Sequence, residues 1–430
     1  MHIQSVSISN VRCFESLQWD LPSRNLKGWH VIIGDNGAGK SSFLRCIALA
    51  LCGPREVLGL RESWETWPRK QRDSKASFIK LSFDDSQTWD KWEKKGRTVS
   101  NFYLSCGFYF KKQANGETTL VASKPKFDPA RHVWSKKPGW FSASYGPFRR
   151  FTGGDAEKKS VFYTHSILGR HLSVFGENIA LTESLEWLSQ LRFEELDGDQ
   201  KSGQLLKNIR EFINQSGFLP HNVRFEEVSS KAVIFLNPEG MQIDVTRLSD
   251  GFRSVLSMTF ELIRQMTACY GTADIFQTQD DGTVTVKAPG VVLIDEIDAH
   301  LHPTWQRKIG FWLTGHFPEL QFIVTTHSPL ICQAAEKGTI FRLPTPGSEQ
   351  SEAGFVNGLT RERLINGDVL DAYGTELFGR DVDRPDTAKK MLQELAQLNQ
   401  KESMKGLTES EKARQIELKK TYSAHILPSF

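Results

Sequence analysis

The sequence predicts an α/β fold, and three apolar segments are the basis of this prediction. Residues 29–33 form an apolar, β-branched run that is typical of a buried strand. Residues 291–294 form a second run, whose lack of polar interruptions indicates a parallel strand buried on both faces. Residues 321–326 are a third strand and lead into His327. The 430 residues suffice for one large α/β domain with insertions or for two domains.

The first strand leads into a glycine-rich loop, Gly34 to Ser41, that matches the pattern G-x-x-x-x-G-K-[ST]. Residues 42–51 follow with apolar side chains at helical spacing. In this context the glycines let backbone N–H groups turn toward a phosphate, and the helix N-terminus adds a positive dipole end. An ordinary glycine-rich turn is the alternative, and the flanking strand and helix disfavour it. The sequence therefore predicts a site for a nucleoside triphosphate.

Each residue type in this loop has an expected role. Lys40 is expected to reach the β- and γ-phosphates, and Ser41 is expected to hold Mg²⁺ through its hydroxyl. The residues of the loop expected to bind the nucleotide are Gly34, Asn36, Gly37, Ala38, Gly39, Lys40, Ser41 and Ser42.

Two carboxylates, Asp295 and Glu296, directly follow the second strand. Asp295 is expected to bind Mg²⁺, directly or through water, and Glu296 is expected to polarise the attacking water. An apolar run that ends in two acidic residues is a weak pattern by itself. Downstream of the phosphate loop it becomes specific and predicts hydrolysis of a nucleoside triphosphate with Mg²⁺ as a cofactor.

Residues 248–254, Leu-Ser-Asp-Gly-Phe-Arg-Ser, precede a helical pattern over 255–267 and resemble the signature motif of ABC-type ATPases. The variant is similar to that of the RecF/SMC-like branch. Ser249 and Gly251 at a helix N-terminus would form a second anion site, although Ser-Asp-Gly is also a common helix cap. The resemblance implies that Ser249, Gly251 and Arg253 close on the γ-phosphate held by a second protomer. It thus implies a head-to-tail dimer with two ATP molecules between its chains.

Three further segments resemble the same ATPases. Asp298 lies in a segment similar to the D-loop, and the resemblance implies that it contacts nucleotide. His327 at the end of the third strand resembles the switch histidine, which implies a catalytic role in sensing the γ-phosphate. Arg12 follows an N-terminal strand and by resemblance reaches toward nucleotide. For His300 and His302 a structural role is favoured, because no third metal ligand is in view.

The resemblance implies the fold of an ABC-type P-loop ATPase head, with a mixed central sheet, an antiparallel β-part and a helical lobe. The absence of a useful heptad run predicts no long coiled coil. Strands are expected at 75–85, 101–111 and 117–123, helices around 180–193 and 203–216, and hairpin turns at 115–116 and 280–282. The expected division is 1–164 with the phosphate loop and β-part, 165–247 as helical lobe, 248–345 from the signature to the switch histidine, and 346–430 as a C-terminal helical extension. No glutamine stands at 139–150, where a Q-loop is expected.

The C-terminal region resembles that of PtuA-like ATPases from Septu and retron-linked anti-phage defence systems. It contains an amphipathic unit at 369–379 and a charged helical pair at 387–399 and 407–422. No nuclease pattern follows the ATPase motifs, so the resemblance implies control of a separate HNH-type nuclease subunit.

Composition excludes several classes of protein. Hydrophobic residues are 39% and charged residues 24% of the chain, as in ordinary globular proteins. No apolar run has the length of a membrane span, and the N-terminus alternates like a strand instead of showing a signal-peptide core. The six cysteines include no C-x-x-C pair, which favours reduced thiols in a cytoplasmic protein.

Residues 61–150 are basic, with 19 lysine and arginine residues against nine acidic ones, and contain six of the eleven tryptophans. Basic residues between aromatic ones suit DNA or the msDNA of a retron, because charge meets phosphate and rings stack on bases. A solvated basic surface with the tryptophans in a local core is the alternative, and it is the favoured one.

Three functions compete at this point. The first is an ATPase that regulates a partner nuclease in phage defence. The second is a DNA-repair protein of the RecF type, whose ATP-bound dimer clamps DNA. The third is the ATPase subunit of a transporter, which the signature variant and Arg12 disfavour. A neighbouring HNH-nuclease gene would distinguish the first from the second.

Overall fold

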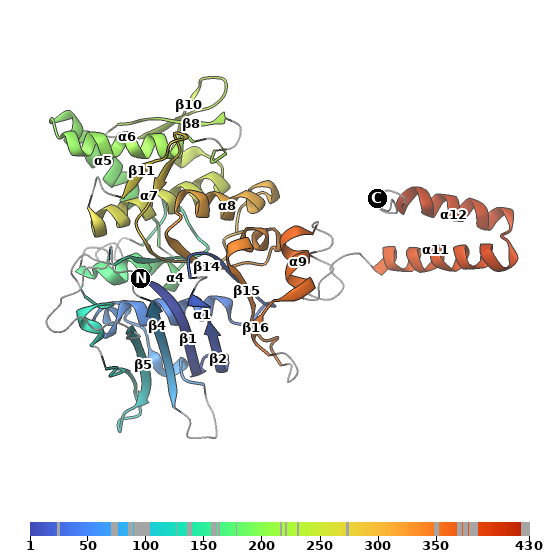
Figure 1. Ribbon diagram of the computed structural model, residues 1–430, viewed down its shortest axis with the longest axis horizontal. Helices are drawn as coiled ribbons and strands as arrows, with labels where there is room; N and C mark the ends of the chain where they lie inside the picture. The colour runs from blue at the N-terminus through green and yellow to red at the C-terminus, as the bar shows by residue number, and fades with distance from the viewer. Residues whose placement is uncertain are drawn as a thin grey trace.

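A six-stranded sheet forms the centre of the computed structural model (Figure 1). Its order is β16-β15-β3-β14-β13-β7, with parallel pairing except between β15 and β16. The strands are β3 (Gly28–Ile33), β7 (Ser142–Tyr145), β13 (Gly290–Ile294), β14 (Leu320–Thr325), β15 (Thr339–Arg342) and β16 (Gly354–Phe355). The structure describes residues 1–422 except 24–25, 70–75, 85–88, 90–103, 127, 136–139, 156–160, 162–163, 178, 216, 220–221, 230–231, 272–274, 348–351, 368–371, 373–376 and 378–385.

Both faces of the central sheet are buried, as the apolar runs predict. Along β13, Leu293 faces one hydrophobic cluster and Ile294 the other, and Ile32 and Val31 alternate in the same way along β3. All four side chains are fully buried. Burying each of these side chains contributes roughly 1.5–3 kcal/mol. Both faces of the sheet must therefore be covered by other elements of the fold.

One face of the central sheet packs on helix α1 (Lys40–Cys52), and an antiparallel sheet covers the other side of that helix. This second sheet has the order β2-β1-β4-β5-β6. Its strands are β1 (His2–Val11), β2 (Phe14–Asp20), β4 (Ser77–Asp84), β5 (Leu104–Lys112) and β6 (Thr118–Ala122). It is the predicted antiparallel β-part, and its β5–β6 turn is a hairpin at Gln113–Gly116, as predicted. Residues 101–103 of the strand expected at 101–111 lie outside the described residues.

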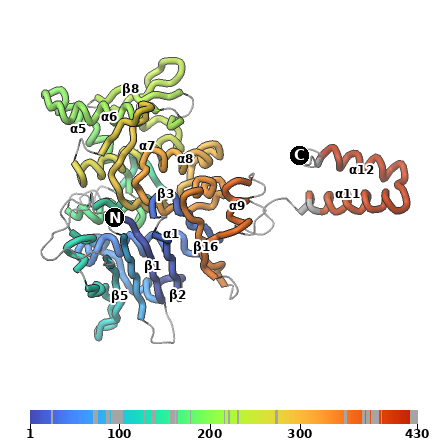
Figure 2. Tube along the Cα trace, viewed as in Figure 1, coloured from blue at the N-terminus to red at the C-terminus, as the bar shows by residue number. Residues whose placement is uncertain are grey.

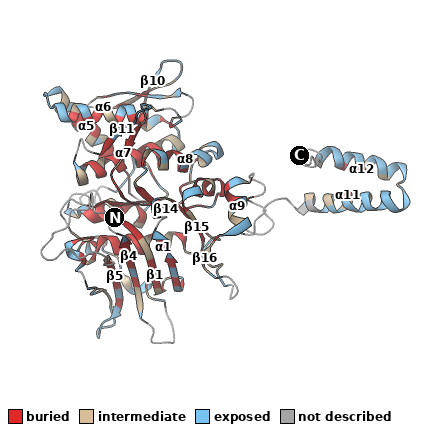
Figure 3. Ribbon diagram, in the orientation of Figure 1, coloured by how far each residue is buried: buried red, intermediate tan, exposed pale blue. Residues whose placement is uncertain are grey.

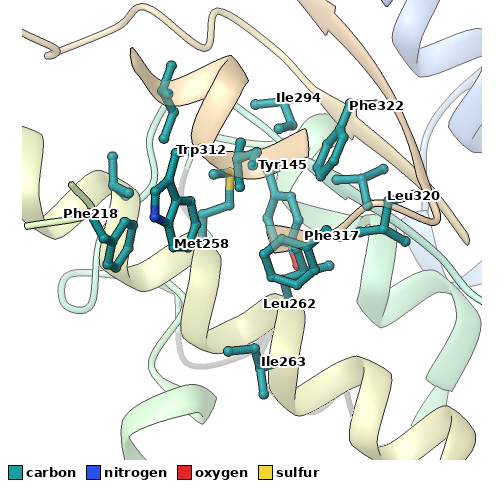
Figure 4. Packing of buried hydrophobic residues seen from close by; sticks show 14 of the residues in the cluster. Tyr145, Phe218, Met258, Leu262, Ile263, Ile294, Trp312, Phe317, Leu320 and Phe322 are labelled. Atoms are coloured by element: carbon teal, nitrogen blue, oxygen red, sulfur yellow. The ribbon is translucent and has the colours of Figure 1, made fainter. Parts of the chain in front are cut away.

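The opposite face of the central sheet packs on helices α7 (Asp250–Tyr270) and α8 (Pro303–His316). Figure 4 shows Met258 and Leu262 of α7 and Trp312 of α8 packing with Ile294 and Phe322 of the central sheet. The signature helix is therefore seated directly on the strands that carry the predicted catalytic residues.

Beyond α7 lies a lobe that mixes helices and strands. Helices α5 (Glu183–Leu196) and α6 (Gln200–Ile213) confirm the predicted helices, with ends shifted by about three residues. A three-stranded antiparallel sheet, β8 (Arg224–Val228), β9 (Val233–Leu236) and β10 (Gln242–Asp244), was not predicted. A bulge in β8 places the buried residues Phe225 and Val228 three positions apart instead of two. The strand therefore lacks the alternation of buried and exposed residues by which a strand is predicted. The predicted hairpin at 280–282 joins β11 (Phe276–Thr278) to β12 (Val284–Val286).

The last described elements, α11 (Asp386–Lys405) and α12 (Glu409–Tyr422), form a helical hairpin, which confirms the predicted pair. The hairpin stands apart from the other described elements (Figure 2), and most of its surface is exposed (Figure 3). The amphipathic unit expected at 369–379 falls almost wholly outside the described residues. The remaining described elements are α2 (Pro54–Val57), η2 (Leu58–Leu60), η3 (Trp64–Thr66), η4 (Pro129–Arg131), α4 (Ser166–Phe175), η6 (Val245–Arg247), η7 (Pro329–Lys337) and α9 (Gly358–Asn366).

The predicted fold class is confirmed: an α/β ATPase head with a mixed central sheet, an antiparallel β-part and a lobe that contains helices. The longest helix of the described residues, α7, has 21 residues, which fits the expectation of no long coiled coil. Within the described part of the chain, no helix has both the length and the apolar character that a membrane span requires.

Candidate nucleotide-binding site

The glycine-rich loop joins β3 to α1, and its lysine is hydrogen-bonded to the backbone at the start of the loop. Lys40 Nζ donates hydrogen bonds to the carbonyl oxygens of Gly34 (2.8 Å) and Asp35 (3.1 Å). Gly37 and Gly39 have φ angles of 80° and 95°, which side chains disfavour. The first turn of α1 has no acidic residue and no capping side chain among the described residues, so its N–H groups can receive an anion.

A side chain at Gly39 is also excluded by packing. A Cβ atom there would collide with Cys13 Sγ and would lie 2.9 Å from the ring of Phe14. The turn after β1 therefore packs against the loop. The guanidinium of Arg12 itself lies 4.2 Å from the ring centroid of Trp67, a cation–π contact. Within the predicted loop, Asn36 and Gly37 are exposed, Ala38 is buried, and Ser41 and Ser42 are half-buried.

The structure brings Lys40 together with the predicted carboxylates. Burial lowers the pKa of Lys40, and the charges of Glu296, Asp295, Asp35 and Asp298 oppose that shift. These groups come from the ends of β3 and β13 and from the segment after β13. Because the carboxyl ends of parallel strands meet at one edge of a sheet, segments more than 250 residues apart in the sequence form one polar centre.

Thr325, the last residue of β14, orients both predicted carboxylate residues. Its Oγ1 donates to Asp295 Oδ1 (2.5 Å) and accepts from the backbone N–H of Glu296 (2.8 Å). Asp295 is 2% exposed, so its carboxylate has almost no contact with water. The hydrogen bond from Thr325 therefore replaces solvation that burial has removed. Thr325 was not among the predicted site residues, because a threonine at a strand end carries no distinctive sequence pattern.

Asp298 and His327 are linked through the residue between β14 and His327. Thr326 Oγ1 donates to Asp298 Oδ1 (2.5 Å) and accepts from the backbone N–H of Ser328 (2.9 Å). Thr326 and Ser328 are buried, whereas His327 between them is exposed. The imidazole is thus presented at the surface by a fixed backbone.

The predicted signature residues lie at the start of α7. Ser249 precedes the helix, is exposed, and makes no side-chain capping bond. A Cβ atom at Gly251 would lie 2.9 Å from the carbonyl oxygen of His300, so the helix start abuts the segment that follows β13. The guanidinium of Arg253 pairs with Asp250 and donates to the carbonyl oxygen of Thr246 (3.2 Å).

Of the two histidines before α8, His302 has a structural role. His302 Nδ1 accepts the backbone N–H of Thr304 (3.3 Å) and caps α8. In the part of the chain that the structure describes, no group of three His, Cys, Asp or Glu residues could hold a metal ion. Hydroxyl and carboxylate oxygens such as those of Ser41 and Asp295 remain suited to Mg²⁺, which keeps several waters and needs few protein ligands.

Arg149, which lies in the segment after β7 where a Q-loop is expected, was missed by the sequence analysis. It is 4% exposed, and each of its five N–H donors meets one acceptor. Nε donates to Ser254 Oγ (3.0 Å), Nη1 to the carbonyl oxygens of Gly146 (2.8 Å) and Asp295 (2.8 Å), and Nη2 to those of Glu296 (3.1 Å) and Ile297 (3.4 Å). A single buried guanidinium therefore connects the signature helix to the backbone of both predicted catalytic carboxylates.

The tryptophans of residues 61–150 point mainly inward. Trp67 is 1% and Trp140 8% exposed, and Trp64, Trp89 and Trp134 are half-buried. Trp92 lies outside the described residues. These five indoles contact other aromatic rings, and Trp134, for example, stacks on Phe108 with ring centroids 5.7 Å apart. The tryptophans therefore support the alternative of a local core instead of a stacking surface for bases.

Two family models match the chain. The model described as "AAA domain, putative AbiEii toxin, Type IV TA system" matches residues 116–333, and a model described as "AAA domain" matches residues 5–128.

The chain is similar to proteins named Septu protein PtuA and to proteins named retron ATPases. Septu protein PtuA of Bacillus mycoides (strain KBAB4) is 24% identical over 389 residues, which are 89% of this chain and 46% of that protein. The Retron Vc95 probable ATPase of Vibrio cholerae serotype O1 biovar El Tor is 23% identical, over 77% of this chain and 71% of that protein. The chain thus spans about half the length of that PtuA protein.

Solved structures with a similar trace include the SMC head domain from Thermotoga maritima, at 13% identity over 83% of this chain and 100% of that chain, with a TM-score of 0.41. An SmcHead bound to the C-winged helix domain of ScpA has 15% identity over 84% of this chain and 100% of that chain, with a TM-score of 0.47.

The resemblance predicted from the motifs is confirmed by these relatives: the chain is similar to PtuA and retron ATPases. Because the first family model covers half of its length, the chain belongs to the AAA-domain family described as "AAA domain, putative AbiEii toxin, Type IV TA system".

Proposed function

We propose that this protein binds and hydrolyses ATP, dimerises around the nucleotide, and controls a partner nuclease in bacterial anti-phage defence. The single observation that carries the proposal is the polar centre at the end of the central sheet. There the buried Lys40 lies within electrostatic reach of Asp35, Asp295, Glu296 and Asp298. Lys40 and the buried Arg149 are two cations against these four carboxylates, which leaves an excess of negative charge that suits a cation-bound triphosphate.

In this proposal each residue has a distinct task. The loop N–H groups and Lys40 bind the phosphates, and Lys40 gives up its bonds to Gly34 and Asp35 when it does so. Ser41 and Asp295 hold Mg²⁺, which supplies charge stabilisation at the γ-phosphate. Glu296 orients and polarises the attacking water, since its backbone is fixed while its side chain is not fully buried.

The proposed dimer is supported by the residues that the chain leaves exposed. Ser249 and His327 are both exposed, whereas Lys40 and Asp295 are buried and hydrogen-bonded. A helix N-terminus with an exposed Ser is suited to an anion delivered by a second copy. Two copies in head-to-tail arrangement would each complete the other's site.

The defence role rests on the printed names of the relatives, Septu protein PtuA and retron ATPase. The proposed partner is a separate HNH-type nuclease subunit. Co-purification of the tagged protein from its native operon, with partners identified by mass, tests this role. Recovery of a nuclease together with ATP hydrolysis by the complex would support it. Hydrolysis without any nuclease partner would leave an ATPase of another pathway.

A second candidate function, a RecF-like ATPase that clamps DNA, has one observation in its favour. The outer face of the antiparallel sheet carries Tyr109, 39% exposed, with its ring centroid 5.9 Å from that of Phe78. Lys80 and Lys111 are exposed on the same face, each two residues from one of these rings. Because β4 and β5 are antiparallel, the lysines flank the aromatic pair on opposite sides. Rings between cations suit single-stranded nucleic acid.

Charge reversal on this face tests the second candidate. The Lys80→Glu, Lys111→Glu double variant should weaken binding of labelled single-stranded DNA at least tenfold by fluorescence anisotropy, with a shallower salt dependence. Lys207→Glu, the same type of substitution at an exposed position of α6, is the control for each single change. Equal binding by all three proteins, or none by the wild type, would remove this candidate.

A further inference from the structure

The hydrogen bonds of Arg149 connect two parts of the protein and leave no donor free to bind a ligand. All five of its N–H donors already bond to the protein, so the guanidinium has no donor for a phosphate. Burial lowers the pKa of Arg149 to about 10, and the charges of Asp295, Asp298 and Glu296 oppose the shift. The side chain therefore stays charged at neutral pH, and its bonds are charge-assisted.

Arg149 holds the backbone on both sides of Glu296. Glu296 has a φ angle of 45°, a left-handed conformation that costs on the order of 1 kcal/mol in a non-glycine residue. Thr325 Oγ1 fixes the N–H of Glu296, and Arg149 fixes the carbonyls on both sides of it and its own. Without these bonds the backbone of Glu296 would leave its left-handed conformation. The carboxylate would then no longer be directed at the attacking water of the proposed reaction.

The fifth bond of Arg149 leads to the signature helix. Ser254 lies on α7, five residues after Ser249, and is 1% exposed. An α-helix moves as a rigid rod over such a distance, so a shift at its N-terminus moves Ser254 as well. Arg149 is hydrogen-bonded both to this helix and to the carbonyl oxygens around Glu296.

We propose that Arg149 is a positioning residue that couples the signature helix of each chain to Glu296 of the same chain. Closure of the signature helix on the nucleotide of the partner would then set Glu296 for hydrolysis of the chain's own nucleotide. The two ATP molecules of a dimer would be hydrolysed cooperatively. This inference rests on the proposed ATPase function and names how that site is regulated.

The test removes the link to the helix and leaves the carbonyl bonds in place. Ser254→Ala deletes only the acceptor of Arg149 Nε. Ser257→Ala is the matched control, since Ser257 is also buried on α7 but its hydroxyl bonds to the carbonyl of Ser254 in its own helix (3.2 Å). Two quantities are measured on the full chain: the Hill coefficient of ATP hydrolysis, and hydrogen–deuterium exchange over residues 290–300 without nucleotide.

We expect Ser254→Ala to keep the affinity for ATP, to lower the Hill coefficient from about 2 to about 1, and to raise exchange over 290–300 several-fold. Ser257→Ala should change neither. Arg149→Lys, which keeps the charge but loses most donors, should lower kcat on the order of 10²-fold at unchanged ATP affinity.

Two outcomes would overturn the coupling: wild-type behaviour of Ser254→Ala in both measurements, or equal effects of Ser254→Ala and Ser257→Ala, which would mean packing alone. A wild-type protein that hydrolyses no ATP would instead refute the proposed function. The exchange measurement needs no catalysis, so it still decides whether Arg149 links α7 to Glu296.

Discussion

The two halves of the candidate nucleotide site differ in how completely their own chain holds them. The half around Lys40 and Asp295 is buried, and Thr325 and the loop carbonyls hold its polar groups. The other half is the start of α7 at Ser249, which is exposed and has no side-chain capping bond. The first half is organised in advance for a nucleotide bound by the same chain. The second has the character of a surface that a partner completes, and the following variants test this contrast.

Lys40→Ala should have the largest effect, because it removes the side-chain cation that lies in the phosphate loop itself. We expect the affinity for ATP to fall at least about 100-fold in titration calorimetry, with hydrolysis lost as well. Lys27→Ala, which removes an exposed lysine paired with Glu319, is the control and should bind like wild type. Unchanged affinity in Lys40→Ala would refute the assignment of the loop.

Ser249→Arg should abolish hydrolysis while leaving folding and ATP affinity unchanged, since it blocks the exposed half alone. Mixing Ser249→Arg with Lys40→Ala makes the comparison sharper. In a head-to-tail pair one composite site contains both lesions and the other contains neither, so part of the activity should return. A mixture that stays inactive while heterodimers form would contradict the shared site.

Glu296→Gln should slow hydrolysis on the order of 10²-fold or more and keep ATP binding, because only the activation of water is lost. The variant should accumulate as an ATP-bridged dimer, measured by light scattering after gel filtration. If it hydrolyses ATP like wild type, another residue is the base, and His327 would be examined next.

Thr325→Val should have the smallest effect of the four. It leaves the N–H of Glu296 without an acceptor and Asp295 Oδ1 without a donor, at unchanged volume. We expect the free energy of unfolding to fall by about 1–3 kcal/mol and kcat to fall about tenfold. Thr314→Val is the control, since its hydroxyl bonds only within α8. Equal stability and kcat in the two variants would show that Thr325 does not position the carboxylates.

Local patterns predicted most of the elements around the site. The strand, loop and helix at 29–51 follow from apolar spacing and glycines that are adjacent in sequence, and the structure has β3, the loop and α1 there. The strand before Asp295 was predicted for the same reason. Elements with irregular spacing were missed: the bulged strand β8, and β7, whose four residues are too few for a periodic signal.

The sequence by itself determined the phosphate loop, the carboxylates at the end of β13, the histidine after β14 and the order of these motifs. Each depends on residues that are neighbours in the chain, so a pattern of a few positions is enough to predict it. Only the tertiary structure decided that Arg149 bonds to residues 105 and 146 positions away, or that Thr325 bonds to Asp295. Packing likewise turned the tryptophans inward and left Tyr109 outside. These outcomes depend on which strand lies beside which, and no local pattern encodes that choice.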